Sequence, residues 1–298
     1  MADPYSYPWL LAYKGISVER TAYGKPIASE SLGSGGFGTV SRGLYKMEGS
    51  KDVDVAVKEP YNAAFIHECP MLKKAFIHEA NTLSKINHTN IVRFYGAVLE
   101  ENNEPIYAIV TEVLDKGLVK YLTDEKNISY DEKYTIIISL ANALEHLHSI
   151  NVIHRNIKPS NIMMKGKAAK LIDFGLSREE EIVTNNYSTR YAGGTPEEEV
   201  WMSPEKRNGK QSTPVSDVYS FGMVMFYILT GEMPSLYMTD EEKKNKLKPY
   251  YGQDDNNFSS LVLECTDSDL EKRPSSATLS KQLREIGSHE KNGTYVYI

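Results

Sequence analysis

The stretch NVIHRNIKPSNIMMKGKAAKLIDFG, residues 151–175, decides how the whole chain is interpreted. Polar residues fill its beginning, at 154–161, and its end, at 173–175, whereas residues 162–172 between them carry two short apolar runs. Short apolar runs bounded by polar and glycine-containing clusters are typical of strands joined by turns. The pattern therefore predicts a loop, a β-hairpin and a second loop.

Three side chains of this stretch, Lys158, Asn161 and Asp173, offer a cation and two oxygen ligands. Phosphoryl transfer needs few groups but needs them together: a residue that orients the nucleophile, a cation for the moving phosphoryl group, and metal ligands. The order of residue types resembles the catalytic and metal-binding loops of the eukaryotic protein kinases, HRDxKxxN and DFG. The resemblance implies that Lys158 contacts the γ-phosphate and that Asn161 and Asp173 bind Mg²⁺.

One residue departs from that pattern, because Asn156 stands where the family has aspartate. The aspartate accepts the hydrogen bond and the proton of the substrate hydroxyl, whereas an amide of similar shape has no carboxylate for this task. A positioned general base contributes on the order of 10²- to 10⁴-fold in rate. We therefore expect Asn156 to occupy the catalytic position of a chain that is inactive or strongly impaired.

The segment SLGSGGFGTV contains several glycines, including Gly33, Gly35 and Gly38. Glycine lets a backbone turn tightly and approach phosphate oxygens, although a glycine-rich hairpin without a ligand gives the same pattern. Further along, VDVAVK alternates valines and ends at Lys58, which predicts a strand. A glycine-rich loop followed by such a lysine resembles the kinase arrangement, which implies that Lys58 pairs with the α- and β-phosphates.

The sequence AFIHE occurs twice and supplies two candidate partners for that lysine, Glu68 and Glu79. In the kinases that the chain resembles, a glutamate of helix αC pairs with the strand lysine and is needed for catalysis. Pro70 interrupts the first copy, because proline is not tolerated inside a helix, whereas the second copy runs on without interruption. We therefore expect Glu79 to pair with Lys58 and Glu68 to be an exposed helix residue.

The resemblance also implies a site for ATP, with Mg²⁺ as the metal. Two antiparallel strands joined by a polar turn are predicted at 92–100 and 105–114. The second strand matches the hinge of the family, where backbone groups contact adenine. The residues implied to line the nucleotide are Leu32, Gly33, Gly35, Gly38, Val40, Ala56, Lys58, Thr111, Glu112, Leu114, Met163 and Asp173.

Three motifs beyond the catalytic loop extend the resemblance toward the C-terminus. WMSPE resembles the APE motif and ends at Glu205, VSDVYSFG resembles a buried helix that contains Asp217, and DLEKRPS contains Arg273. The family arrangement implies that Asp217 tethers the backbone of the catalytic loop. It also implies that Glu205 and Arg273 form a buried ion pair.

The segment between the DFG-like loop and WMSPE contains hydroxyl residues that could be phosphorylated. A phosphate there could pair with Arg155 and order the loop. The candidates are Thr184, Tyr187, Ser188, Thr189 and Tyr191. The same segment carries extra residues, Glu197 to Val200, next to WMSPE. Their three carboxylates either favour a basic peptide substrate or form a solvated bulge.

Composition excludes several other classes of protein. A net charge of -6 argues against non-specific binding to nucleic acid, which depends on a basic surface. Cys69 and Cys265 stand far apart without metal-ligand spacing, so neither a disulfide framework nor a zinc site is predicted. The first residues lack a signal-peptide pattern and no apolar run is long enough to span a bilayer. We expect a cytoplasmic protein without membrane insertion.

The expected fold class is therefore α+β, the bilobal protein kinase fold. A small β-rich lobe with helix αC is expected at 27–114 and a larger, mainly helical lobe at 115–287. Residues 1–26 are expected to be a leader and 288–298 a tail.

The residues within the motifs indicate which class of protein kinase the chain resembles. IKPSN resembles serine/threonine kinases, and the phrases DVYSFG and IVTEV resemble the tyrosine-kinase-like group, with tyrosine or dual specificity left as an alternative. Protein substrates and signalling partners are implied. Three hypotheses concern Asn156: an aspartate deliberately changed to asparagine, a natural pseudokinase that binds nucleotide and serves as a scaffold, or an enzyme in which Asn156 supports slow transfer.

Overall fold

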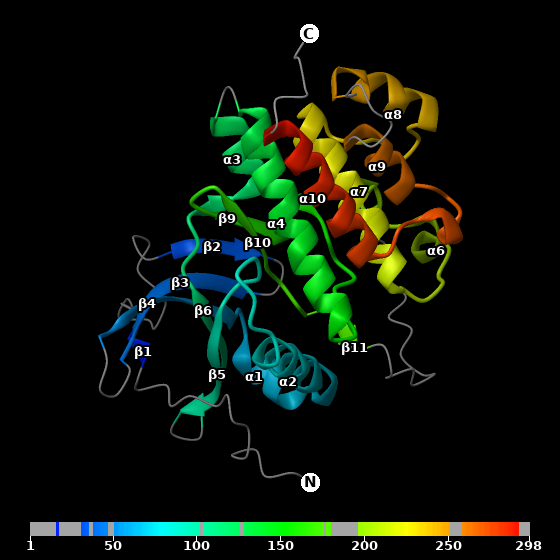
Figure 1. The fold of residues 1–298 in the computed structure, drawn as a ribbon. Coiled ribbons are helices and arrows are strands. Elements are labelled where there is room, and N and C mark those ends of the chain that lie inside the picture. Colours follow the sequence, from blue (N-terminus) through cyan, green and yellow to red (C-terminus); the bar gives the residue numbers. More distant parts are fainter. Residues whose placement is uncertain are drawn as a thin grey trace. The chain divides into compact units, whose positions relative to one another are not determined.

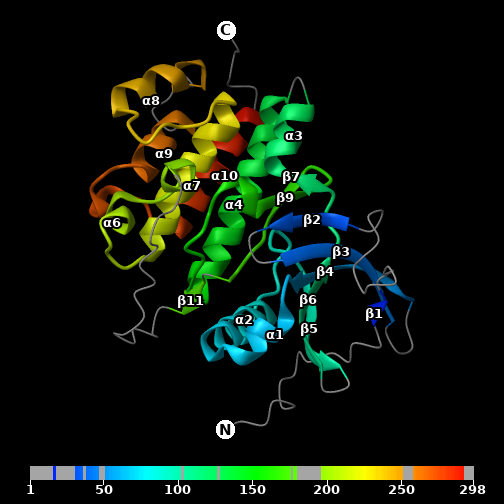
Figure 2. The same cartoon turned by 180° about the vertical axis from the view of Figure 1, so that it is seen from behind.

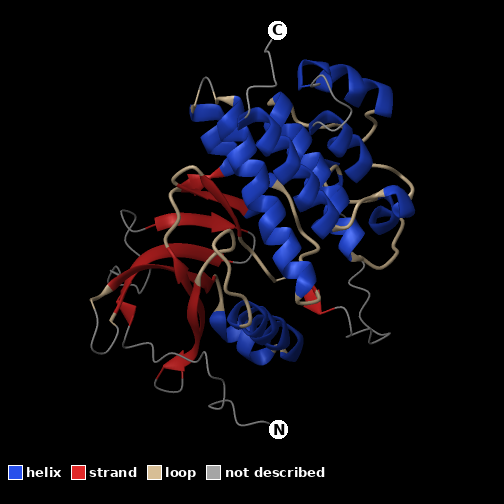
Figure 3. Ribbon diagram, in the orientation of Figure 1, coloured by secondary structure: helices blue, strands red, loops and turns tan. Residues whose placement is uncertain are grey.

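The computed structural model describes residues 16–17, 31–35, 38–46, 51–101, 104–125, 128–175, 177–179, 196–250 and 258–291. The chain divides into two compact units, the first formed by Met1–His88 and Val92–Leu114 and the second by Thr89–Ile91 and Asp115–Ile298. Figure 1 labels the elements, and Figure 3 shows that strands dominate the first unit and helices the second. The expected α+β fold class is confirmed.

The first unit contains a six-stranded antiparallel sheet with the order β1-β3-β4-β6-β5, in which β2 also pairs with β3. Its strands are β1 Ile16–Ser17, β2 Ser31–Gly35, β3 Gly38–Tyr45, β4 Val53–Pro60, β5 Phe94–Glu101 and β6 Glu104–Glu112. The glycine-rich segment and the strand ending in lysine are thus neighbours, β2 and β3 forming a hairpin that pairs with β4.

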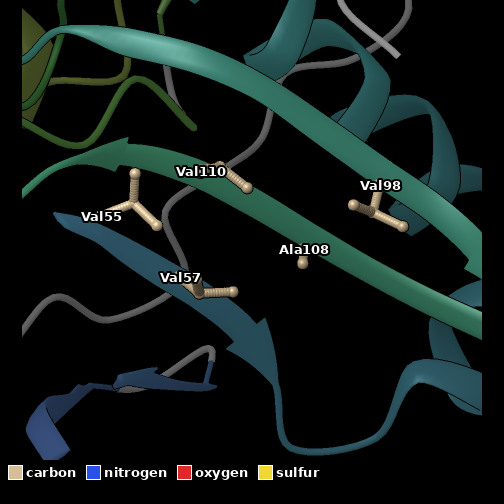
Figure 4. Packing of buried hydrophobic residues seen from close by; sticks show 5 residues of the cluster. All are labelled: Val55, Val57, Val98, Ala108 and Val110. Carbon is tan, nitrogen blue, oxygen red and sulfur yellow. The ribbon is translucent and has the colours of Figure 1, made fainter. Parts of the chain in front are cut away.

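The alternating valines of VDVAVK pack one face of this sheet. Val55 and Val57 on β4 are fully buried against Val98 on β5 and against Ala108 and Val110 on β6, as Figure 4 shows. Side chains of alternate residues on a strand point to the same face, so this cluster follows directly from the sequence pattern. Its burial fixes the register of β4 and hence the face on which its remaining residues lie.

Gly38 is required by the close approach of two strands. A Cβ atom at this position would lie 1.9 Å from the carbonyl oxygen of Glu59 on β4. No side chain can be accommodated at that distance. The packing of the two strands therefore requires glycine at position 38, whether or not a phosphate binds there.

Two helices of the first unit lie side by side next to β5 and β6, as Figures 1 and 2 show. They are α1 Ala63–Glu68 and α2 Pro70–Ser84. The side chain of Asn62 caps α1, and Pro70 occupies the first turn of α2, where its missing N–H costs nothing. Pro70 therefore separates the two AFIHE copies, as the sequence predicts.

The second unit is mainly helical. Its helices are α3 Leu118–Asp124, α4 Tyr130–Ser149, α5 Pro196–Glu199, α6 Pro204–Arg207, α7 Pro214–Thr230, α8 Asp240–Leu247, α9 Phe258–Cys265 and α10 Ser276–Lys291, with 3-10 turns at Pro159–Asn161, Lys248–Tyr250 and Leu270–Lys272. Its short strands are β7 Lys116–Gly117, β8 Val152–Ile153, β9 Ile162–Lys165, β10 Ala168–Leu171 and β11 Arg178–Glu179. None of the helices in the described ranges is both long enough and apolar enough to cross a membrane.

Helix α7 is the buried centre of the second unit. Every residue from Ser216 to Leu229 is buried, in agreement with a helix that is apolar all round. The hydroxyl groups of Thr213 and Ser216 form a capping box at its start, and Gly231 ends it with a positive φ of 71°. Helix α4 packs against both α7 and α10. Its apolar residues at helical spacing, Ile137, Leu140, Leu144 and Leu147, are buried.

A buried ion pair joins α6 to the segment before α10. The guanidinium of Arg273 donates from Nη1 to Oε1 of Glu205 at 2.9 Å and from Nη2 to Oε2 at 3.0 Å. Ser216 on α7 donates a further hydrogen bond to Oε1 at 2.8 Å. Burial raises the pKa of the Glu205 carboxyl, but these hydrogen bonds outweigh it and lower that pKa to about 2. The predicted pairing of Glu205 with Arg273 is confirmed.

Candidate functional site

The stretch 151–175 folds as a loop, a hairpin and a second loop. Strands β9 and β10 pair antiparallel with Ile162 opposite Leu171. The second strand also binds residues 89–91, because the amide N–H of Leu171 donates to the carbonyl of Asn90 at 2.9 Å. The hairpin thus places the two polar loops side by side at its open end, where the amide N–H of Ile172 donates to the carbonyl of Asn161 at 3.0 Å. Residues Thr89–Ile91, expected in the first lobe, belong to the second unit.

Asp217 holds the backbone of the catalytic loop. Its carboxylate accepts the amide N–H of His154 at 2.7 Å and that of Arg155 at 2.8 Å. Arg155 has a positive φ of 67°, a conformation that costs a residue with a side chain of the order of 1–3 kcal/mol and persists only where the surroundings impose it. The predicted tether is present, and it fixes the direction in which the loop leaves β8.

His154 contributes to the same loop from inside the core. Its Nε2 donates to the carbonyl of Ile172 at 3.2 Å, its Nδ1 accepts the amide N–H of Asn156 at 3.3 Å, and its ring packs edge-on against Phe174. Burial lowers the pKa of this imidazole, so the neutral ring with one donor and one acceptor matches its contacts. His154 therefore joins the catalytic loop to the DFG-like loop as a structural residue.

His148 has a larger role than the sequence suggested. The sequence alone favours a surface or packing histidine at this position, but its side chain is only 8% exposed and bridges two polar groups. Its Nε2 lies 3.3 Å from a carboxylate oxygen of Asp217, and its Nδ1 lies 2.9 Å from the hydroxyl of Ser276. A surface position is therefore wrong, and a packing role is confirmed. Burial raises the pKa of the Asp217 carboxyl, but hydrogen bonding to His148 and the charges nearby lower it overall.

Asn156 and Asn161 are linked through the turn between them. The side-chain amide of Asn161 donates from Nδ2 to the backbone carbonyl of Asn156 at 2.8 Å. This bond uses the amide's donor group, so its oxygen is the atom suited to a metal ion. Asp173, in the second loop, has a positive φ of 64°. Both predicted metal-binding residues therefore sit on backbone that is fixed by its surroundings.

The oxygen atoms of Asp173 and Asn161 are ligands that suit a hard cation. Within the described ranges, no group of three or more His, Cys, Asp or Glu side chains could hold a metal ion. Mg²⁺ commonly takes one or two protein oxygens and completes its shell with water and substrate phosphates. One carboxylate, Asp173, and one amide, Asn161, match that need.

Lys158 is paired with a residue from the extra segment. Its Nζ donates to Oε1 of Glu198 at 2.7 Å. Glu198 lies on the short helix α5, whose last turn is closed by hydrogen bonds from the amide of Trp201 to the Glu198 carbonyl and from Met202 to the Glu199 carbonyl. Trp201 is buried and packs edge-on against Tyr227 of α7. The segment expected to be a solvated bulge or a substrate-binding feature is therefore anchored to the core and reaches the catalytic loop.

A pocket of the second unit brings these groups together. Asn156, Lys158 and Glu198 line it, along with Arg155 and Lys206. The Lys206 ammonium also donates to the backbone carbonyl of Arg155. Burial lowers the pKa of Lys206 to about 8, and the nearby cations Arg155 and Lys158 act in the same direction. The pocket therefore holds three basic side chains and the carboxylate of Glu198.

In the first unit, Lys58 is paired with Glu79. Nζ of Lys58 lies 3.2 Å from Oε1 of Glu79, and the two side chains are 33% and 12% exposed. Glu68 is exposed at the end of α1. The structure therefore confirms the choice of Glu79 that the position of Pro70 suggested.

The sheet register gathers the other residues that were predicted to line a nucleotide in this unit. Gly33 lies opposite Val40, Val40 opposite Lys58, and Ala56 opposite Thr111. Leu32 is 44% exposed on β2, Val40, Thr111 and Glu112 are half-buried, and Ala56 and Leu114 are buried. In the second unit Met163 is half-buried on β9. The candidate phosphorylation sites at 184–191 lie outside the described residues.

Replacing Glu79 by glutamine is expected to lower any kinase activity of the chain by at least about 10-fold. The neutral amide can neither compensate the charge of Lys58 nor hold its side chain in place. Phosphate incorporation into a basic protein substrate at saturating ATP measures the effect. Glu68→Gln makes the same chemical change on an exposed residue of α1 and should leave the rate within about 2-fold. Equal losses in both variants would contradict the assignment of Glu79.

Comparison with protein-family models gives a match over residues 27–283 to the model described as protein tyrosine and serine/threonine kinase. Relatives among curated proteins include a Dictyostelium discoideum protein named as a probable serine/threonine-protein kinase, 33% identical over 87% of this chain. Wall-associated receptor kinase-like 1 of Arabidopsis thaliana is 38% identical over 71% of this chain, and serine/threonine-protein kinase CTR1 of the same plant is 33% identical over 69%.

These relatives are much longer than the chain described here. The matched region covers 15% of the Dictyostelium protein, 28% of the wall-associated receptor kinase-like protein and 24% of CTR1.

Proposed function

The chain belongs to the protein tyrosine and serine/threonine kinase family, and we propose that it transfers the γ-phosphate of ATP to serine and threonine hydroxyls of protein substrates. We propose that this transfer is slow, because Asn156 replaces the aspartate of the catalytic loop. One observation carries the proposal: the catalytic loop that holds Lys158 and Asn161 is fixed by Asp217 through two backbone hydrogen bonds of 2.7 and 2.8 Å. Serine/threonine specificity is supported by the names of the relatives.

Residues of both units have the chemistry that ATP and Mg²⁺ require. In the first unit Lys58, held by Glu79, would bind the α- and β-phosphates. In the second unit Asn161 and Asp173 would hold Mg²⁺, and Lys158 would contact the γ-phosphate. When bound, Mg²⁺ neutralises phosphate charge, and ATP supplies the phosphoryl group.

Asn156 decides how fast such a site can work. Its side chain can accept a hydrogen bond from a substrate hydroxyl and orient it, but it cannot take up the proton. What remains is catalysis by positioning and electrostatic stabilisation, which supplies most of the rate enhancement in phosphoryl transfer. The site is therefore suited to slow transfer.

The same asparagine favours a second candidate function, a pseudokinase that binds nucleotide and presents its surface to signalling partners. In that case Lys58, Asn161 and Asp173 would stabilise a conformation and no phosphate would be transferred. The two functions share nucleotide binding and differ only in transfer.

Calorimetric titration with ATP tests the function common to both candidates. We expect binding that depends on Mg²⁺, and an affinity at least about 10-fold weaker in Asp173→Asn, because that change removes a charged metal ligand. The control Asp131→Asn makes the same change at an exposed position in the first turn of α4 and should bind normally. Absence of ATP binding by the unchanged chain would overturn the proposal.

A further inference from the structure

Two departures from the kinase pattern occur at separate places in the sequence and meet in one pocket. The first is the missing carboxylate at Asn156, and the second is the acidic insertion that forms α5. In the folded chain Glu198 of that insertion lines the same pocket as Asn156. The insertion therefore places a carboxylate in the same pocket as the position from which one is missing.

The position of Glu198 is well defined by its contacts. Its carboxylate accepts the Lys158 ammonium at 2.7 Å, and Lys158 follows Asn156 by two residues in the catalytic loop. The turn that carries Glu198 is anchored by Trp201, which is 5% exposed. The Glu198 side chain itself is 38% exposed, so it remains accessible from the pocket. A carboxylate has several acceptor sites and can bind Lys158 and a hydroxyl at the same time.

The pocket contains more basic than acidic side chains. Arg155, Lys158 and Lys206 are its three basic side chains, and the amide of Asn156 is neutral. Glu198 provides the compensating negative charge. Its neighbours on α5, Glu197 and Glu199, are exposed and half-buried, and Glu198 is the member of the trio for which contact with the catalytic loop is observed.

We propose that Glu198 supplies the carboxylate that position 156 lacks and accepts the proton of the substrate hydroxyl. As the hydroxyl oxygen bonds to the γ-phosphorus of ATP, the bond from that phosphorus to the bridging oxygen breaks and its electron pair stays on ADP. The hydroxyl proton moves to the Glu198 carboxylate and then to water, so the carboxylate is regenerated. This inference rests on the transfer activity proposed above, and it makes Glu198 a catalytic residue contributed by the insertion.

The test combines two substitutions in the full chain. The transfer rate to a serine-containing basic peptide is measured for the unchanged chain, Glu198→Gln, Asn156→Asp and the double variant, at saturating Mg-ATP and peptide. Glu197→Gln serves as the matched control, because it makes the same change on an exposed residue of the same helix. The affinity for Mg-ATP is measured for each variant, so that a change in kcat is separated from a change in binding.

We expect Glu198→Gln to lower kcat by at least about 10-fold in the unchanged chain. In the Asn156→Asp background the same substitution should cost less than about 3-fold, because aspartate then accepts the proton. Such dependence on residue 156 would not arise if Glu198 only supported the fold. Glu197→Gln should change kcat by less than about 2-fold in both backgrounds.

A second measurement checks the ion pair without any turnover. The rate at which acetic anhydride modifies Lys158 is followed by mass spectrometry in the nucleotide-free chain. We expect faster modification of Lys158 in Glu198→Gln, because the ammonium loses its partner, and no change in Glu197→Gln. Equal modification rates in all variants would show that the ion pair does not persist in solution and would overturn the inference.

Three results of the kinetic experiment would overturn the inference. A higher kcat in Glu198→Gln would show that the contact blocks Lys158 instead of assisting transfer. An equal loss in both backgrounds would show a structural role. If the unchanged chain does not transfer phosphate but Asn156→Asp does, Glu198 is not a proton acceptor. The proposal that the domain is built for kinase activity would then still hold. If no variant transfers phosphate although all bind Mg-ATP, the proposed transfer activity itself fails.

Discussion

Replacing Asn156 by aspartate is expected to raise the rate of phosphate transfer by about 10²-fold or more. The new carboxylate would accept the proton of the substrate hydroxyl from the catalytic loop, at a position that the structure already holds. Two hydrogen bonds from the neighbouring backbone to Asp217 and one to His154 fix that position. Because the side chains of asparagine and aspartate have nearly the same shape, the substitution should leave the loop conformation unchanged. The gain should be larger still in Glu198→Gln, where no other carboxylate assists.

The measurement is the initial rate of phosphate transfer from ATP to a basic protein substrate, with Mg-ATP affinity determined in parallel. Asn208→Asp, which makes the same chemical change at an exposed position after α6, is the control and should not alter the rate. Transfer that stays at background in Asn156→Asp, with ATP binding intact, would favour the pseudokinase function. It would also mean that something other than residue 156 prevents the reaction.

Replacing Arg273 by methionine is expected to lower the free energy of unfolding of the second unit by about 3–5 kcal/mol. The side chain of Arg273 is fully buried, and it satisfies both carboxylate oxygens of Glu205 while it also donates to the backbone carbonyl of Asp267 at 2.8 Å. Methionine keeps much of the apolar volume but leaves the Glu205 carboxylate buried and without its cation. The loss therefore comes mainly from an uncompensated charge and only in part from a missing contact.

Urea denaturation at pH 7 of chains that also carry Trp9→Phe, followed by the fluorescence of Trp201, measures this loss. The control is Lys281→Met, which removes one partner of an exposed pair with Glu285 on α10, and it should change the free energy of unfolding by less than about 0.5 kcal/mol. Similar small effects in both variants would show that the Glu205–Arg273 pair is not a main support of the fold.

Several features of the candidate site were predictable from local sequence. Lys58 ends a strand pattern that comes shortly after the glycine-rich segment. Pro70 indicates which of the two AFIHE copies continues as a helix, and hence that Glu79 is the partner of Lys58. The tether from Asp217 could be expected from the motif in which it lies. In each case a strong local signal, either a helix breaker or a strand period, restricts the choice.

Other features depend on contacts between distant segments that have no local signal. The carboxylates of α5 were visible in the sequence, but a short acidic helix could face solvent equally well, and only the anchoring of Trp201 against α7 turns Glu198 toward Lys158. The same holds for His148, whose polar partners come from α7 and α10. The helical period of α4 places this histidine near a buried face, yet it does not say that a carboxylate will be found there.

The burial of the catalytic loop also means that its shape is a property of the domain core. Asp217 lies on a helix that is buried along most of its length, and His154 is fully enclosed, so both are needed for the second unit to fold well whatever the chain does with ATP. Substitutions at Asn156 or Glu198 should therefore leave the shape of the loop unchanged. During evolution, selection for stability would preserve Asp217 and His154, whereas Lys158 and Asn161, which the loop presents, would be preserved by their contacts with phosphate and metal.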